Sequence, residues 1–134
     1  MKFGIYSFLF LMVITSCEDN ATPNLSDHEW EVIAINGTQL SGTLPTLSFD
    51  LEEGKVNGNA SCNNFFGSVE VIESSIKFGM MGSTRMMCPD MTNEDLLFKN
   101  LDKVNSYSFK GNHLLLSSEN DEVSLKLQPK TFTD

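Results

Sequence analysis

Short segments in which every second residue is apolar recur along most of this chain of 134 residues. Leu47, Phe49 and Leu51 alternate with polar residues, and the same period of two returns near the C-terminus in residues 106–110 and 123–128. A period of two places apolar side chains on one face of a β-strand, so each segment predicts a half-buried strand. Further segments rich in β-branched, aromatic and other apolar residues also predict strands: 30–35, 65–71, 76–78 and 114–116.

Turn signals separate these segments. Asn36-Gly37 is a strong hairpin dipeptide, and Glu53-Gly54 and Gly111-Asn112 mark two further turns. Short strands at intervals of about 8–15 residues predict an antiparallel sheet that curls into a sandwich or a barrel.

One segment has the period of a helix. Thr92 is a suitable N-cap, acidic residues follow it in the first turn, and Leu97, Leu101 and Val104 recur at helical spacing. These residues predict a helix of about ten to twelve residues with one apolar face. The predicted fold class is mainly β, a small antiparallel, barrel-like curled sheet with one α-helix packed against it.

The N-terminus has the order of a bacterial lipoprotein signal. Lys2 precedes an apolar run, residues 5–14, that is too short to span a bilayer but suits a signal peptide. Ile14-Thr15-Ser16-Cys17 resembles the lipobox, whose cysteine is lipidated and becomes residue one. The alternatives are an ordinary signal peptide with a chance cysteine and a buried N-terminal strand. We predict a lipoprotein signal peptide over residues 1–16 and lipidation of Cys17.

The polar residues that follow predict a flexible tether over residues 17–25 and a folded domain over residues 26–130. Several acyl chains on Cys17 hold a protein on a membrane. The expected location is therefore the bacterial cell envelope, at the outer membrane, with the domain facing the periplasm or the medium. Glu18-Asp19 resembles the surface-export signals of some Gram-negative lipoproteins.

The charge balance excludes one class of partner. The chain carries 18 acidic and 9 basic residues, for a formal net charge of −9. Non-specific nucleic-acid binding needs a basic surface, so no nucleic-acid partner is expected. The expected partners are the membrane, through the lipidated N-terminus, and another envelope protein; the oligomeric state is left open.

Once Cys17 carries lipid, Cys62 and Cys88 are the candidate disulfide, because the envelope outside the cytoplasm is oxidising. The alternatives are two buried reduced thiols and, without a C-x-x-C spacing, a redox-active pair.

Two motifs carry a family resemblance. The first is the run of residues 58–67, which contains Cys62-Asn63, and the second is Thr84-Arg85-Met86-Met87-Cys88. With Trp30, Asn36-Gly37, the segment from Glu94 to Leu101, and the closing residues Gly111, Asn112, Leu114 and Leu116, they resemble the META domain, also called the HslJ-like heat-shock family. The resemblance covers about residues 25–128. It departs from the family at Ser61, where glycine is usual.

The resemblance implies a compact barrel-like β fold with one helix, in envelope lipoproteins linked to heat or antibiotic stress. The family has no established catalytic residue or cofactor, so no cofactor and no metal are expected. The sequence also lacks G-x-S-x-G, H-E-x-x-H, a P-loop and a dinucleotide fingerprint.

Three further features have two interpretations each. Arg85, the sole arginine, is either an internal salt-bridge anchor or a contact for an anionic ligand. Five clustered methionines either bind Cu(I) through thioethers or, as we favour, fill an irregular core: Met80, Met81, Met86, Met87 and Met91. His28 and His113 sit in no catalytic or ligand motif and are expected at the surface.

The leading functional hypothesis is a non-catalytic, membrane-anchored envelope lipoprotein that binds or supports another envelope component under stress. The alternative is a carrier that encloses a small apolar ligand in its barrel. An enzyme is a distant third.

Overall fold

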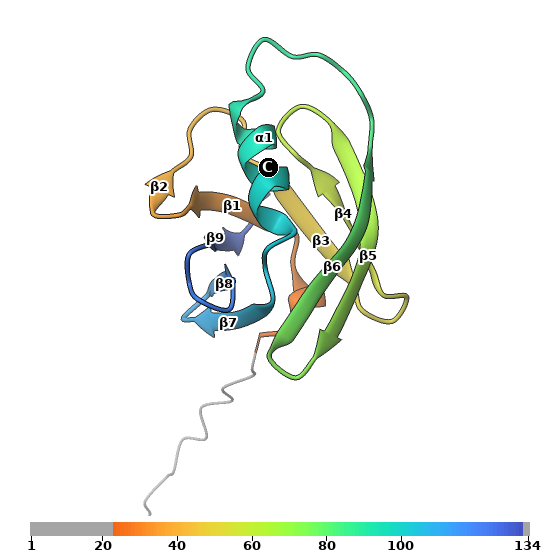
Figure 1. The fold of residues 1–134 in the computed structure, drawn as a ribbon, viewed down its shortest axis with the longest axis vertical. Helices are drawn as coiled ribbons and strands as arrows, with labels where there is room; N and C mark the ends of the chain where they lie inside the picture. Colours follow the sequence, from red (N-terminus) through yellow and green to blue (C-terminus); the bar gives the residue numbers. More distant parts are fainter. Residues whose placement is uncertain (1–22, 133–134) are drawn as a thin grey trace, which may run out of the picture.

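The computed structural model describes residues 23–132 of the chain (Figure 1). The predicted signal peptide, the lipidation site Cys17 and residues 17–22 of the predicted tether lie outside the described residues. Among those described, no helix is both long and apolar enough to cross a membrane. The elements in chain order are η1 (Leu25–Asp27), β1 (Trp30–Ile35), β2 (Thr38–Gln39), β3 (Thr46–Asp50), β4 (Lys55–Asn59), β5 (Asn64–Ile72), β6 (Ser75–Ser83), α1 (Thr92–Leu101), β7 (Ser106–Lys110), β8 (His113–Ser117) and β9 (Ser124–Pro129).

The strands form one antiparallel sheet that curls into a ring (Figure 1). Its order is β2-β1-β3-β4-β5-β6-β7-β8-β9, and β1 also pairs with β9, which closes the ring. The junction between β6 and β7 is the weakest, because Ser75 and Ser106 are the sole partners in register there. The predicted fold class, a curled antiparallel sheet with one helix, is confirmed.

The inside of the ring is filled with apolar side chains. Leu47 and Phe49 point inward from β3, as their alternation predicts, and Leu125 and Leu127 do so from β9. The largest completely buried side chain is Trp30, whose indole N–H donates a hydrogen bond of 2.8 Å to the carbonyl of Leu25. A ligand inside the ring, as the carrier hypothesis requires, would have to displace these side chains.

The Asn36-Gly37 dipeptide forms the predicted turn between β1 and β2. The φ angles of Asn36 and Gly37 are +51° and +79°. Two-residue hairpin turns of type I′ need a positive φ at both positions, which Asn and Gly adopt most readily.

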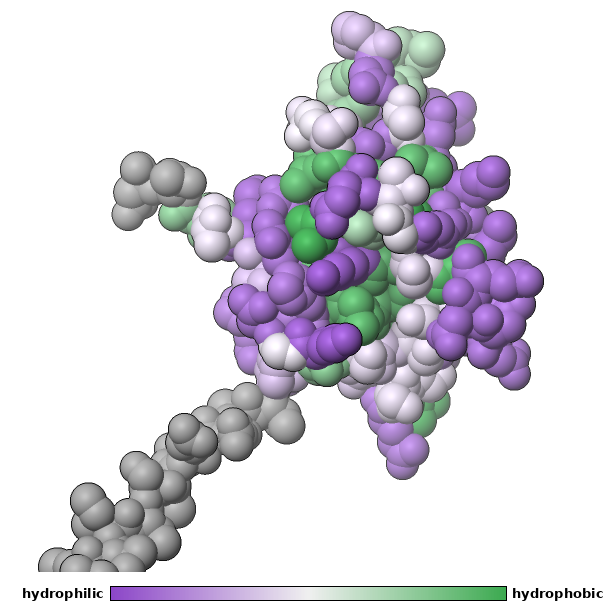
Figure 2. Space-filling view, turned by 90° about the vertical axis from the view of Figure 1, so that its left-hand side faces the viewer, coloured by the Kyte–Doolittle hydropathy of each residue, from purple (hydrophilic) through white to green (hydrophobic). Residues whose placement is uncertain are grey.

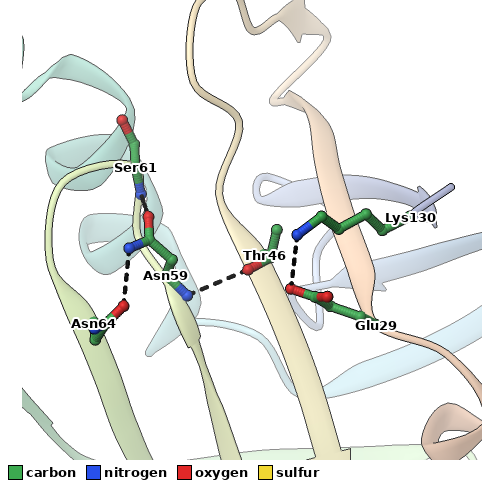
Figure 3. Close-up of polar contacts among 6 residues, drawn as sticks. All are labelled: Glu29, Thr46, Asn59, Ser61, Asn64 and Lys130. Carbon is green, nitrogen blue, oxygen red and sulfur yellow. Dashed lines mark hydrogen bonds and ion pairs between the residues drawn. The ribbon is translucent and has the colours of Figure 1, made fainter. Parts of the chain in front are cut away.

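The fold begins earlier than the sequence predicts. Leu25 is only 2% exposed, and Asn24 caps η1 through a hydrogen bond from the amide of Ser26. The predicted tether of residues 17–25 therefore reaches too far, since its last two residues belong to the domain. An ion pair of 3.2 Å between Glu29 and Lys130 then joins the start of β1 to the end of β9 (Figure 3).

The helix differs from the prediction at both ends. Thr92 is its first residue rather than its cap, and the carboxylate of Asp90 accepts a 2.9 Å hydrogen bond from the Thr92 amide. Hydrogen bonds from the backbone and side chain of Thr92 hold the pKa of Asp90 below its ordinary value. Val104 lies beyond the helix end but is buried, so the apolar face continues into the following turn.

Strand β4 is not predicted by the sequence pattern, and β6 is longer than the predicted strand of residues 76–78. Asn57, Gly58 and Asn59 are poor β-formers, yet they pair with both β3 and β5. Gly58 is required there because a Cβ at this position would lie 1.8 Å from the carbonyl oxygen of Thr46. β6 runs on through Met80 and Met81 because β5 supplies a partner as far as Ser83.

We predict that Gly58→Ala lowers the free energy of unfolding by about 3 kcal/mol, because the new methyl group overlaps a backbone atom that cannot move alone. Urea denaturation measures this change. Gly79→Ala is the matched control, since the one close contact of a Cβ there is the Ser68 hydroxyl, which can rotate away. Equal losses in the two variants would contradict this account.

Candidate functional site

The two sequence motifs meet the start of the helix at one end of the ring (Figure 1). Asn63 belongs to the loop between β4 and β5, Thr84 and Met86 to the segment after β6, and Glu94 to the first turn of α1. We call Asn63, Thr84, Met86 and Glu94 the Asn63 clasp. Its hydrogen bonds join Asn63 to residues that lie 21 to 31 positions away in sequence.

The side chain of Asn63 uses all four of its hydrogen-bonding positions. Its oxygen accepts hydrogen bonds from the Thr84 hydroxyl at 2.9 Å and from the Met86 amide at 2.6 Å. Its NH₂ group donates to the Met86 carbonyl at 3.1 Å and to one Glu94 oxygen at 2.8 Å. A primary amide offers two donors and an acceptor with two lone pairs, so Asn63 suits both segments at once.

Glu94 completes the clasp from the helix. It is only 6% exposed, and its second oxygen accepts a 2.8 Å hydrogen bond from the backbone amide of Asn63. Both carboxylate oxygens are therefore bonded to one residue of the β4–β5 loop. Hydrogen bonds to an ionised carboxylate are stronger than neutral ones, so they fix the first turn of α1 against the sheet.

A disulfide between Cys62 and Cys88 lies beside the clasp. The two cysteines flank the clasp residues of the loop segments, with a sequence separation of 26. In the chain-entropy model, closing a loop of this length stabilises the fold by about 3 kcal/mol. The bond and the clasp thus hold the same two segments together, one covalently and one by hydrogen bonds.

The chain enters the clasp through a turn built by Asn59 (Figure 3). Its side-chain oxygen accepts a 2.9 Å hydrogen bond from the Ser61 amide, and its NH₂ group donates to the Asn64 side chain at 2.9 Å. Its own amide donates to the Thr46 hydroxyl at 3.3 Å. Ser61 has a φ of +94°, a conformation that glycine adopts without strain. This explains why glycine suits the position where the chain carries Ser61.

The chemistry of the clasp is structural. The side-chain positions of Asn63 and both oxygens of Glu94 are occupied by partners within the fold. Residues 23–132 contain no group of three or more His, Cys, Asp or Glu side chains placed to hold a metal ion. His28 is exposed and packs edge-on against Trp30, whereas His113 is half-buried at the start of β8.

Arg85 lies in the segment between the two cysteines but takes no part in the clasp. Its side chain is exposed, and it forms no ion pair with another residue of the described part of the chain. The structure therefore does not place Arg85 as an internal salt-bridge anchor. Its role as a contact for an anionic ligand stays a prediction.

Three of the five clustered methionines are exposed, whereas the favoured interpretation places them in the core. Met80, Met87 and Met86 are 94%, 88% and 55% exposed, whereas Met81 packs against the core. The interpretation that the cluster fills an irregular core is therefore wrong for the three exposed residues. They lie where β6 ends and the segment toward α1 begins.

Sequence reasoning missed the buried role of Glu94. Its place in the first turn of a helix was assigned to the helix dipole, which is the common reason for an acidic residue there. The available signal was that Glu94 belongs to the same family pattern as the two cysteine motifs.

Over residues 23–132, the fold and the clasp define a small β domain that is held together by one disulfide and one buried polar cluster. The family model of the META domain matches residues 23–130. The chain therefore belongs to the META domain family. No curated protein matches it.

Solved structures of other proteins are similar in fold. The NMR structure of a protein from Burkholderia xenovorans has a TM-score of 0.61 and 22% identity, over 81% of this chain and 85% of that one. The crystal structure of a DUF4847 family protein from Bacteroides vulgatus has a TM-score of 0.60 and 12% identity, over 81% and 96%. At these identities the likeness shows the fold alone.

We predict that Glu94→Gln lowers the free energy of unfolding by about 2 kcal/mol, because its NH₂ group then faces a donor of Asn63. Asp95→Asn is the matched control, since Asp95 is exposed in the same helical turn and should change the stability by less than about 0.5 kcal/mol. Chemical denaturation of the oxidised protein measures both. A Glu94→Gln variant as stable as the wild type would contradict the role of the clasp.

We also predict that Ser61→Gly raises the stability by about 0.5–1 kcal/mol, because it removes the strain of a left-handed residue and this outweighs the added flexibility of the unfolded chain. Thermal unfolding at fixed pH measures the gain. Ser61→Ala keeps the Cβ and should show no gain, and a gain equal to that of the glycine variant would refute strain as the cause.

Proposed function

We propose that this protein is a non-catalytic envelope lipoprotein whose META domain binds or supports another envelope component and contributes to stress tolerance. The observation that carries the proposal is the saturated clasp. The side chains of Asn63 and Glu94 hold the fold together, and this leaves them no free group with which to attack or protonate a substrate. The function then belongs to the outer surface of the domain.

The sequence of the N-terminus supports anchoring to a membrane of the cell envelope. Ile14-Thr15-Ser16-Cys17 supplies the lipidation motif, and the residues from Glu18 to Thr22 lead from it to the domain. Hydrophilic surface predominates on the face shown in Figure 2, and hydrophobic surface gathers mainly in the middle, with smaller patches toward the top and the bottom. Together with a net charge of −9, this favours a domain that stays in water beside the membrane rather than in it.

We predict that Cys17→Ser abolishes lipidation and releases the protein from the membrane, since the serine offers no thiol for acylation. The full chain is produced in a Gram-negative bacterium that is fed an alkyne fatty acid. The measurements are the amount of alkyne label on the protein and the share of the protein found in the membrane fraction. In a strain that lacks the protein, survival after heat or antibiotic challenge should return with the wild-type chain and not with Cys17→Ser.

The matched control is the double variant Cys62→Ser, Cys88→Ser, which removes the disulfide and keeps Cys17. It should take up the label as the wild type does. Labelling of Cys17→Ser would overturn the anchor. Two results would overturn the proposed function. One is survival at the wild-type level, after heat or antibiotic challenge, of the strain that lacks the protein. The other is an activity of the purified domain on generic esters or glycosides.

A further inference from the structure

Strand β6 has an open edge along most of its length. On one side it pairs with β5 from Ser75 to Ser83. On the other side the single partner in register is Ser106, beside a 3.2 Å hydrogen bond from the Ile76 amide to the Asn105 carbonyl. No strand of the described chain pairs with β6 on this side beyond that point. An open strand edge presents a row of donors and acceptors that can pair with another extended chain.

The hydrogen bonds at its two ends show which residues face this edge. The Thr84 amide donates to the Asn64 carbonyl at 3.0 Å, so the amide of the preceding Ser83 points away from β5. The backbone N–H and C=O groups of every second residue point to the same side of a strand. Those of Met81 therefore point the same way as those of Ser83, and those of Phe78 the same way as those of Ile76. The backbone groups of Phe78, Met81 and Ser83 therefore face the opening.

A cleft of about 370 Å³ lies between this edge and the helix. Phe78 and Met81 line it from β6, and Phe98 and Leu101 line it from α1. Met80, beside them, is 94% exposed. Ser83 and Asp102 also line it, so the cleft offers a largely apolar wall with a polar margin next to unpaired backbone groups. An extended peptide that adds to a sheet uses such an arrangement.

The charges beside the edge differ from those of the whole chain. Residues 75–87 contain Lys77 and Arg85 and no acidic residue, in a chain with a net charge of −9. Glu70 lies opposite Lys77 on β5 and Asp102 lines the cleft, but neither basic side chain forms an ion pair within the described residues. Both basic side chains are exposed, with Lys77 near the start of the open stretch and Arg85 just beyond its end at Ser83. They complement carboxylates on an incoming peptide, whereas two copies of this acidic chain repel each other.

We propose that β6 binds an extended, acidic segment of another envelope protein as an additional strand. The segment exchanges main-chain hydrogen bonds with Phe78, Met81 and Ser83, inserts one apolar side chain into the cleft, and places carboxylates beside Lys77 and Arg85. This inference rests on the proposed function and names the site and the class of its partner.

The test uses a nine-residue peptide of alternating Thr and Val with a central Leu and a Glu at each end, added to the purified full chain. NMR measures amide hydrogen exchange. Saturating peptide should slow exchange at Phe78, Met81 and Ser83 at least fivefold and leave Thr84, already bonded to β5, unchanged. A peptide with Lys at both ends should bind at least threefold more weakly, and one N-methylated at alternate amides should give no protection.

Ser83→Pro removes an outward amide without touching the bonds to β5 and should weaken peptide binding at least fivefold, while Ser83→Ala should not. No protection, or equal protection by the Lys peptide, would overturn the inference. Slow exchange at these three amides without peptide would also overturn the inference, because another segment would then occupy the edge. That segment is a second copy of the chain if the protection grows with protein concentration, or residues 17–22 if their deletion removes the protection. If peptide binding fails while Cys17-dependent survival holds, the inference alone is wrong and the proposed function stands.

Discussion

The hydrogen bonds made by the side chain of Asn63 are the interaction on which the rest of the structure depends. These four hydrogen bonds join the β4–β5 loop, the segment after β6 and the start of α1. A helix of ten residues is too short to be stable alone, so α1 forms because it is held in place. Asn93, which donates to the carbonyls of Ser41 and Thr43, and Asn100, which accepts from Asn36, attach it elsewhere.

This arrangement separates the part of the molecule that maintains the fold from the part that is free to act. Asn63, Thr84 and Met86 of the two family motifs are bonded internally, and the disulfide between Cys62 and Cys88 joins the same two segments. The sheet remains open where β6 and β7 barely meet, and α1 stands beside that opening with a cleft between. By holding α1 there, the clasp also shapes the surface proposed to receive a partner.

Much of the fold could be predicted from sequence because strand faces and turns are local properties. The alternation of Leu47 and Phe49, the Asn36-Gly37 turn and the pair Cys62 and Cys88 all appear in the structure as expected. Strand β4 could not be found, because its pairing with two neighbours outweighs the poor strand propensity of its own residues. The exposure of Met80 and the burial of Glu94 reverse the usual preferences of these residue types, and only the tertiary contacts decide them.

The most direct test of the clasp is a double-mutant cycle between Asn63→Ala and Glu94→Ala, with the free energy of unfolding measured for all four oxidised proteins. Two groups in direct contact within one polar network should show a coupling energy of about 1.5–3 kcal/mol. Such a value is what this account predicts. Additive losses, with a coupling energy of less than about 0.5 kcal/mol, would show that Asn63 and Glu94 act independently and would contradict it.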